Sequence, residues 1–382
     1  MKRFCFTDEE NCKYFIVKVE TDAGIHGLGE VGIPYWGGAI DQALEHLSEI
    51  VIGSDVLATE RLWQIMFRAG FFPADKVYSC AISAIDIALW DIKGKVFDVP
   101  VFKLLGGPVR DKVACYPHVQ GIGTSALIEN CLAAIDSGWQ FLRWHLPSAF
   151  EAGLSDDAGL IDPRRAITTT VDQVAAVREA VGDDIGICLD VHTRLDTAHA
   201  IDLCTRLTPY KPFFVEDPIR SENRQSYRTL ATHVSLPLAA GEQWSSKWDF
   251  REVIENELIR YARIDLCTVG GITEALKITG WCETHYIDIV PHNPLGPVSA
   301  AAGIALCMAS TNVGVQEMPR APGSYARDLF PEQIEWKDGY AWCGDTPGLG
   351  VELNEDLAHA NKAPLNSWPP VLSRPDGALN NW

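Results

Sequence analysis

Three acidic residues each close a short apolar run, and they follow one another at equal intervals along the chain. Asp190 ends the run ICLD, Glu216 lies in FFVED, and Glu242 ends LAAGE. Each run precedes a polar, helix-forming stretch, an alternation typical of parallel α/β folds. Because the carboxyl ends of the strands in a (β/α)8 barrel converge on one rim, we expect the three carboxylates to meet there. Oxygen-only ligands favour a hard cation, Mg²⁺ first, although any one acid alone could be an ordinary helix N-cap.

The same interval continues with three further polar residues, which we expect at the ends of the next three strands. Asp265 follows YARI, His292 follows IDIVP, and Glu317 follows VGVQ. Adjacent strands would place Asp265 beside His292, where a carboxylate fixes the imidazole tautomer and raises its basicity, so His292 is a candidate general base. His192 lies two residues beyond Asp190 and therefore points to the same side, as a candidate general acid. Taken singly, either histidine would be read as structural, but of ten histidines only these two fall on the series of strand ends.

The order Asp, Glu, Glu, Asp, His, Glu on successive strands resembles the mandelate racemase branch of the enolase superfamily, and the resemblance covers nearly the whole chain. Two groups of acid-sugar dehydratases within that branch are similar to different segments. The segments SAIDIALWDIKGK (83–95), DVHTRLD (190–196), VGGITEALKI (269–278) and PHNPLGPVSAAA (291–302) look like the D-galactonate dehydratases. The segments YPHVQG (116–121), GEQWSSKWD (241–249) and DGYAWCGDTPGLGVELNEDLA (338–358), with the closing PDGALNNW, look like the D-mannonate dehydratases.

The resemblance and the βα alternation together imply an α/β fold: a TIM-like (β/α)7-8 barrel with an α+β capping domain. The cap would be built from residues 1–112 and joined by the C-terminal segment 320–382, with the barrel over 113–319. A strand pair around FIVKVETDAGIHGLGE and helices around AIDQALEHLSEIV, TERLWQIMFRAG and SAIDIALWDIKGK are expected in the cap. We expect the first capping strand, at MKRFCFTDEEN, to be shorter than is usual in the family. Candidates for the lining of the barrel mouth are Tyr35, Trp36, Phe71 and Phe72, with core or interface packing as the alternative.

The base is the point at which the two dehydratase groups differ. The mannonate enzymes use a tyrosine in the loop after the second strand, helped by an arginine on that strand. Arg143 matches the arginine, but residues 147–166 contain no tyrosine. The galactonate enzymes use the dyad histidine as base, matched by His292, and the histidine after the first metal ligand as acid, matched by His192. Other branches carry a Lys-x-Lys pair where this chain has Arg143, Trp144 and His145, so a lysine base is excluded.

The implied mechanism is loss of water from a sugar acid through an enediolate. Mg²⁺ held by the three carboxylates would bind the substrate carboxylate, and a protonated Glu317 would donate a hydrogen bond to the opposite oxygen. His292 would take the C2 proton and His192 would protonate the departing C3 hydroxyl, giving a 2-keto-3-deoxy acid. Residues expected to contact substrate are Arg143, His118, His145 and Trp36; the alternative is that they are ordinary inward-facing barrel residues.

Composition limits the partners of the protein. A formal net charge of −19 argues against nucleic acid and anionic membranes. Eleven cysteines, including Cys80, Cys188, Cys267 and Cys307 within apolar runs, are typical of buried thiols in a reducing cytosol. Neither a secretory segment nor an apolar run of about 18 residues is found. We therefore expect a cytoplasmic homo-oligomer acting on a small acid sugar.

Three functions remain open at this point. The first is a Mg²⁺-dependent dehydratase of an aldonate, D-galactonate before D-gluconate or D-mannonate. The second is a racemase, epimerase or cycloisomerase on the same site, although His192 on the side of the leaving group favours dehydration. The third is a member with negligible turnover that binds a metabolite or serves regulation, which the missing tyrosine and the unfamiliar His145 would explain.

Overall fold

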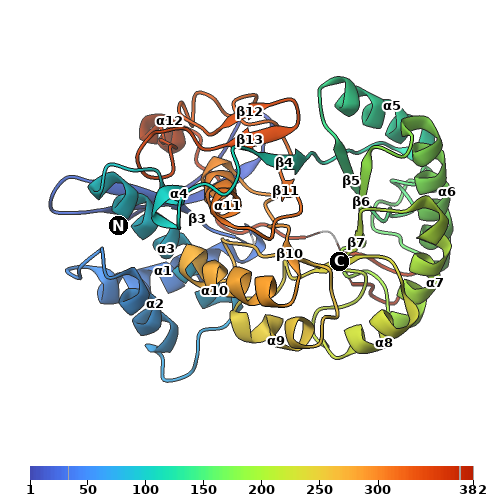
Figure 1. Ribbon diagram of the computed structural model, residues 1–382, viewed down its shortest axis with the longest axis horizontal. Helices are drawn as coiled ribbons and strands as arrows, with labels where there is room; N and C mark the ends of the chain where they lie inside the picture. The colour runs from blue at the N-terminus through green and yellow to red at the C-terminus, as the bar shows by residue number, and fades with distance from the viewer. Residues whose placement is uncertain (33, 370, 382) are drawn as a thin grey trace.

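A three-stranded antiparallel sheet and three long helices make up the N-terminal region of the computed structural model, which describes residues 1–32, 34–369 and 371–381 (Figure 1). The expected strand pair is confirmed as β2 (Lys13–Glu20) and β3 (His26–Glu30). A third strand, β1 (Lys2–Thr7), pairs with β2 along its whole length, and the expectation that it is shorter than in related proteins stays a prediction. Its Phe4 and Phe6 are buried and alternate with more exposed neighbours, which is the period-two signal of a strand. The expected helices are confirmed as α1 (Gly37–Val51), α2 (Thr59–Arg68) and α3 (Lys76–Val96), with a short α4 (Val101–Leu104) after them.

Helix α3 packs directly on strand β3, and two glycines of the strand allow this. A Cβ at Gly27 would lie 2.1 Å from the carbonyl oxygen of Ala88, and one at Gly29 would lie 1.7 Å from that of Ala84. No side chain fits at such distances, so glycine is required for this close approach of strand and helix. The helix is thereby fixed between the small sheet and the rest of the molecule.

The following part of the chain alternates strands with helices, as the sequence predicts, and its strands β5 to β10 form a six-stranded parallel sheet in chain order. Strand β11 pairs in parallel with β4, and single parallel bridges join His118 to Arg143 and Ile289 to Val313. The helices lie along the outside of these strands (Figure 1). The strands are β4 (Val113–Tyr116), β5 (Phe141–His145), β6 (Gly186–Asp190), β7 (Phe214–Glu216), β8 (Leu238–Ala240), β9 (Tyr261–Ala262), β10 (Asp288–Ile289) and β11 (Gln316–Glu317). The helices are α5 (Gly123–Asp136), α6 (Pro163–Val181), α7 (Thr197–Leu207), α8 (Ser226–His233), α9 (Lys247–Glu255), α10 (Gly271–Thr284) and α11 (Pro297–Ala309).

Two buried carboxylates of the N-terminal region cap helices of the parallel sheet. Asp86 accepts hydrogen bonds from the backbone nitrogen and the hydroxyl of Thr273, at 2.9 and 2.6 Å. Glu30 accepts from the backbone nitrogens of Gly296 and Ser299, at 2.8 and 2.9 Å. Helices α10 and α11 both have glycine at the N-cap and no capping side chain of their own. The first turns of both helices therefore depend on acceptors from a distant part of the sequence.

The C-terminal segment contacts both parts of the molecule. It adds β12 (Glu335–Lys337) and β13 (Tyr340–Trp342), which continue the sheet of β4 and β11. Helix α12 (Glu355–Ala360) then lies against β1, as the predicted return to the cap requires. The chain next crosses to the loops after β5 and β6, where Ser373 O accepts a hydrogen bond from Ile161 N at 2.9 Å. The proposed domain limits stay predictions.

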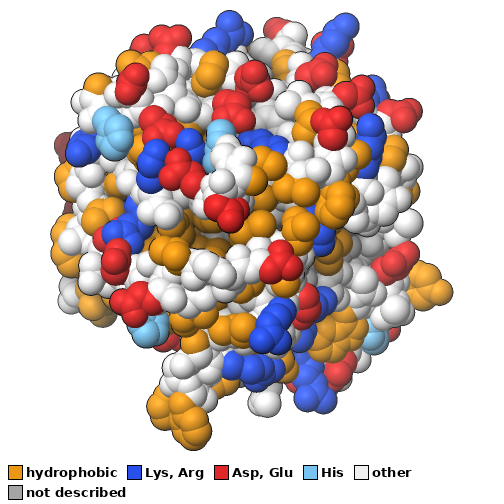
Figure 2. Space-filling view, turned by 90° about the vertical axis from the view of Figure 1, so that its left-hand side faces the viewer, with side chains coloured by type: hydrophobic (Ala, Val, Ile, Leu, Met, Phe, Trp, Pro, Cys, Tyr) orange, Lys and Arg blue, Asp and Glu red, His pale blue; other side chains and the backbone are white. Residues whose placement is uncertain are grey.

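Acidic and basic side chains are mixed on the face that Figure 2 shows, and neither sign dominates it. Figure 2, which views the side of the N-terminal region, shows acidic and basic side chains intermingled, with some hydrophobic groups protruding. All eleven cysteines are free, and Cys80, Cys188, Cys267 and Cys307 are buried. Within the described ranges of the chain, none of the helices is both long and apolar enough to cross a membrane.

Candidate active site

The three predicted metal ligands meet at the carboxyl ends of neighbouring strands. Strand β6 ends at Asp190, β7 ends at Glu216, and Glu242 lies two residues past the end of β8. One carboxylate oxygen from each residue lies within 4.8 Å of those from the other two. The parallel register, which pairs Asp190 with Glu216, brings the side chains together.

The burial, protonation behaviour and oxygen atoms of these three carboxylates suit a divalent cation. Asp190 and Glu216 are fully buried, and Oε2 of Glu216 is buried without a hydrogen-bond partner among the described residues. Burial raises the pKa of Glu216 to about 7 and that of Glu242 well above its usual range. Like charges this close need a cation or protons to coexist, and oxygen-only donors suit Mg²⁺.

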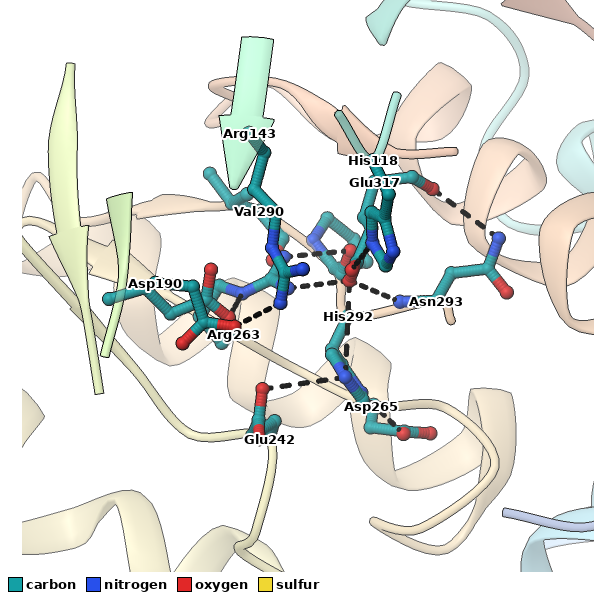
Figure 3. Close-up of polar contacts among 12 residues, drawn as sticks. His118, Arg143, Asp190, Glu242, Arg263, Asp265, Val290, His292, Asn293 and Glu317 are labelled. Carbon is teal, nitrogen blue, oxygen red and sulfur yellow. Dashed lines mark hydrogen bonds and ion pairs between the residues drawn. The ribbon is translucent and has the colours of Figure 1, made fainter. Parts of the chain in front are cut away.

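The predicted dyad is present beside the cluster (Figure 3). His292 Nδ1 lies 2.7 Å from Asp265 Oδ2, while Asp265 Oδ1 accepts a hydrogen bond from Cys267 N at 2.7 Å. The other ring nitrogen, His292 Nε2, lies 3.4 Å from Glu242 Oε2 and faces the cluster. Burial lowers the pKa of His292, but Glu242, Glu317 and Asp265 outweigh it and raise the pKa to about 9. A cation bound to Glu242 would cancel part of that effect and favour the neutral, basic ring.

His192 lies on the Asp190 side of the cluster. Its Nε2 is 2.7 Å from Asp190 Oδ2 and 2.9 Å from Arg143 Nη2, and its backbone nitrogen donates to Asp190 Oδ1 at 2.7 Å. Arg143 also forms an ion pair with Asp190 (Figure 3). Burial, with Arg143 adding to it, lowers the pKa of His192 to about 4 despite Asp190. The two histidines thus occupy separate sides of the carboxylates.

Arg263, which was not among the residues predicted from the sequence, is fully buried in the site. Its Nε donates to Glu216 Oε1 and its Nη2 to Glu317 Oε2, both at 2.5 Å, and Nη1 donates to Val290 O at 2.9 Å. The guanidinium therefore joins a metal ligand to the last acid of the series. Its position two residues before Asp265 was the signal available, since period two places both side chains on one side of the strand.

Glu317 differs from its expected protonation state. It accepts hydrogen bonds from Asn293 N at 2.8 Å and pairs with His118 Nε2 at 2.5 Å, besides Arg263. Burial would raise the pKa of Glu317, but Arg263, His292 and His118 hold it well below its usual range. The carboxylate is thus an ionised acceptor, and the prediction of a protonated donor is wrong. Burial lowers the pKa of His118 to about 4, so this ring is neutral at pH 7.

His145 lies next to the site and has a partner that sequence spacing did not reveal. The register of β5 and β6 pairs His145 with Asp190, and its ring stacks on that of His192 with centroids 5.2 Å apart and planes at 23°. Its Nε2 lies 2.7 Å from Glu151 Oε1, in the loop after β5.

Of the four aromatic candidates for the mouth, Tyr35 is half-buried and the other three lie at the surface. Trp36 is 60% exposed, and Phe71 and Phe72 in the loop after α2 are 90% and 76% exposed. Their role in lining the substrate site stays a prediction.

A second residue that the sequence analysis missed is Asp217, directly after Glu216. It is buried, and the hydroxyl of Tyr227 lies 3.4 Å from its Oδ1. Burial, with Glu216 and Asp190 nearby, raises its pKa well above the usual range. A neutral Asp217 adds no further negative charge to the cluster.

Comparison with known families covers both parts of the chain. The family described as "Mandelate racemase / muconate lactonizing enzyme, N-terminal domain" matches residues 3–106. The family described as "Enolase C-terminal domain-like" matches residues 126–357.

Individual proteins are similar over almost the full length. D-galactonate dehydratases from Pectobacterium atrosepticum and Ralstonia pickettii are each 36% identical over 377 residues, 97% of this chain and 97% of each relative. Among solved structures, an enolase from Pantoea ananatis with bound D-gluconate and Mg is 29% identical, with a TM-score of 0.92 over 100% of this chain and 98% of that one. An enolase from Agrobacterium radiobacter with bound Na and L-malate is 27% identical, with a TM-score of 0.90 over the same shares.

Proposed function

Because the chain belongs to the mandelate racemase branch of the enolase superfamily, we propose that it is a Mg²⁺-dependent hydro-lyase acting on a sugar acid. It removes the elements of water across C2 and C3 and releases a 2-keto-3-deoxy acid. The alternatives of racemase and cycloisomerase share the metal site but need no acid beside the leaving group.

One observation supports the proposal above the others: two histidines lie on separate sides of one carboxylate cluster. His292, held by Asp265, faces Glu242, whereas His192 lies against Asp190. A β-elimination needs a base at one carbon and an acid at the oxygen of the next carbon, and this arrangement supplies both.

Asp190, Glu216 and Glu242 would hold Mg²⁺, which supplies Lewis-acid stabilisation of the enediolate oxygens when bound. The chain's own residues then move the protons. Nε2 of His292 takes the C2 proton and the C3–O bond breaks. His192 gives a proton to the departing hydroxide from its imidazolium form, which a bound anionic substrate would favour over the neutral ring of the free protein. The resulting enol takes a proton at C3, loses the proton of its C2 hydroxyl and becomes the 2-keto acid.

The remaining polar residues bind and orient. Arg143 supplies positive charge beside Asp190, where an anionic substrate needs it in a chain of net charge −19. Arg263 and His118 both contact the carboxylate of Glu317 and hold it in place. Glu317 in turn orients these two side chains and does not itself donate a hydrogen bond to the substrate. Substrate contact by His145 is the alternative to a role for its ring against His192.

The substrate we propose is an aldonate with the C2 configuration of D-galactonate. The relatives named D-galactonate dehydratase are 34 to 36% identical over the whole chain, and the Pantoea ananatis structure contains D-gluconate. D-gluconate and D-galactonate share their configuration at C2 and C3, whereas D-mannonate is inverted at C2. The loop after β5 also contains no tyrosine to serve as a base on the opposite face.

The finer features of the fold belong to the same proposal. We infer that strands β4 to β11 close into a TIM-like barrel, supported by the β4–β11 pairing and the bridges His118 to Arg143 and Ile289 to Val313. The division into a cap of 1–112, a barrel of 113–319 and a returning segment of 320–382 accords with family matches at 3–106 and 126–357.

We also propose a cytoplasmic homo-oligomer. Eleven free cysteines suit a reducing compartment, and the exposed aromatic pair Phe71 and Phe72 offers an apolar contact for a second copy. Light scattering on the wild-type protein, and on a variant with both residues changed to serine, measures the assembly.

A substrate screen tests the function. Purified protein with Mg²⁺ is incubated separately with D-galactonate, D-gluconate and D-mannonate, and the 2-keto-3-deoxy product is measured as its semicarbazone. We expect turnover of D-galactonate or D-gluconate and little of D-mannonate. Efficient turnover of D-mannonate alone would overturn the base assignment, and C2 exchange without keto acid would indicate a racemase or epimerase.

A further inference from the structure

We propose that His145 and Glu151 form a positioning pair that holds the ring of His192 in the plane needed to protonate the leaving group. The expected effect on the reaction rate rests on the proposed function, whereas the contacts of His145 with Glu151 and His192 do not depend on that function. Neither residue belongs to the metal cluster or the Asp265–His292 dyad.

Hydrogen bonds other than the one to His145 hold Glu151 in place. Its Oε2 accepts a hydrogen bond from Ser148 N at 2.8 Å, and its backbone oxygen accepts from Gly123 N, at the start of α5, at 2.9 Å. Partial burial would raise the pKa of Glu151, but His145 outweighs it and lowers the pKa to about 2. An ionised, anchored carboxylate thus lies 2.7 Å from Nε2 of His145.

The hydrogen bond orients the His145 ring, and the ring in turn covers one face of His192. The two centroids are 5.2 Å apart and the planes are inclined by 23°. The contacts of His192 Nε2 with Asp190 and Arg143 restrain one edge of the ring. The stacked ring of His145 adds a contact on the face of His192, where it opposes tilting of the ring out of its plane.

The two loops are also joined to each other. Arg194, two residues after His192, donates from Nη1 to the carbonyl oxygen of Leu146, next to His145. The C-terminal segment bonds both loops, through Ser373 to Ile161 and through Asn381 to Thr193. The histidine stack therefore lies between two loops that these hydrogen bonds hold together.

A positioning role for the acid predicts a specific kinetic pattern. His292 removes the C2 proton on the Glu242 side, away from the stack, whereas His192 is needed only when the C3–O bond breaks. Losing the stack should slow dehydration and leave exchange of the C2 hydrogen with solvent deuterium intact. A general structural defect would reduce both rates together.

Three variants and a matched control test the pair on the full-length protein with Mg²⁺ and D-galactonate or D-gluconate, whichever the wild-type protein uses. His145→Asn and Glu151→Ala should each lower kcat for dehydration by about 10-fold or more, with C2 exchange within about 2-fold of wild type and KM little changed. His145→Phe, which keeps a ring over His192 but loses the hydrogen bond to Glu151, should recover part of the loss. His199→Gln removes a comparable imidazole–carboxylate pair, with Asp196, on the surface, and should behave as wild type.

The contrary outcomes are distinct. A raised KM at constant kcat would make His145 a substrate contact, and equal loss of exchange and dehydration would make the pair merely structural. No loss, or a Phe variant as slow as the Asn variant, would overturn the stacking argument.

A measurement without substrate separates this inference from the proposed function. In protein labelled with ¹⁵N-histidine, the ring protons of His192 should shift in His145→Asn because the ring current of His145 is lost. Unchanged signals would show that the rings do not stack in solution and would overturn the inference. If the wild-type protein neither exchanges nor dehydrates any aldonate while the shift is seen, the proposed function fails and the stacked pair stands.

Discussion

The substitution Asp265→Asn tests the dyad more sharply than removal of the histidine, because the geometry fixes the orientation of the new amide. Oδ1 of Asp265 accepts a hydrogen bond from Cys267 N at 2.7 Å, and an asparagine keeps that bond only through its own oxygen. The amide NH₂ must then point at His292 Nδ1, where the carboxylate oxygen now lies 2.7 Å away. A donor at that place makes Nδ1 an acceptor and puts the ring proton on Nε2.

With its proton on Nε2, His292 presents a donor to the substrate and cannot accept the C2 hydrogen. A histidine locked in the wrong tautomer by this kind of change costs about 10⁴-fold in kcat, which corresponds to about 5 kcal/mol of transition-state stabilisation. We expect both dehydration and C2 exchange to fall by about this factor. The amide is isosteric with the carboxylate, so the protein should still fold.

The assay measures exchange of the C2 hydrogen by NMR in D₂O together with keto-acid formation. Melting temperature and the apparent Kd for Mg²⁺, taken from the dependence of melting temperature on Mg²⁺ concentration, serve as controls, and both should stay close to wild type. Exchange within about 10-fold of wild type in a folded, Mg²⁺-binding variant would refute the reasoning, because the tautomer would then not decide the rate.

Three other predictions concern the metal, the two histidines and the cap. Mg²⁺ at about 100 times its Kd should stabilise the wild-type protein by about 2.7 kcal/mol and Glu216→Gln hardly at all; an equal rise in melting temperature for both would remove the metal site. His292→Asn should lose C2 exchange and dehydration, whereas His192→Asn should lose dehydration and keep exchange; wild-type exchange in the His292 variant would make another group the base. Burial raises the pKa of Asp86 to about 7, so the folded state keeps a proton that the unfolded chain releases near pH 4. The free energy of unfolding should therefore fall as the pH rises from about 4 to about 7, by up to about 4 kcal/mol from this residue, and should fall less in Asp86→Asn. Urea unfolding at several pH values measures this, and the same dependence of the free energy of unfolding on pH in both proteins would contradict it.

The site could be predicted from sequence where it depends on strand ends and not where it depends on loops. Equal spacing located Asp190, Glu216 and Glu242 because one βα unit has a nearly constant length, and the same spacing located the dyad. Arg263 had a usable signal in its period-two relation to Asp265 but was read as part of an apolar run.

Other contacts left no signal in the sequence. The approach of Glu151 to His145 depends on the conformation of a long loop, which residue types alone do not determine. The ionised state of Glu317 depends on Arg263 and His118, which come from two other strands. The C-terminal crossing to Thr193 is likewise decided by tertiary packing.

The capping of α10 and α11 by Asp86 and Glu30 has a consequence for how the enzyme matures. These two helices directly follow the loops that carry Asp265 and His292. The backbone next to the dyad therefore depends on hydrogen bonds from the N-terminal region, which cap the first turns of both helices. During synthesis the N-terminal region emerges first, and its carboxylates must wait for their amide partners until most of the remaining chain has appeared. The C-terminal half made on its own would have unsatisfied amides at both places. Hydrogen exchange from C2 of an aldonate would then measure the docking of the two halves, since the base is built only when they meet.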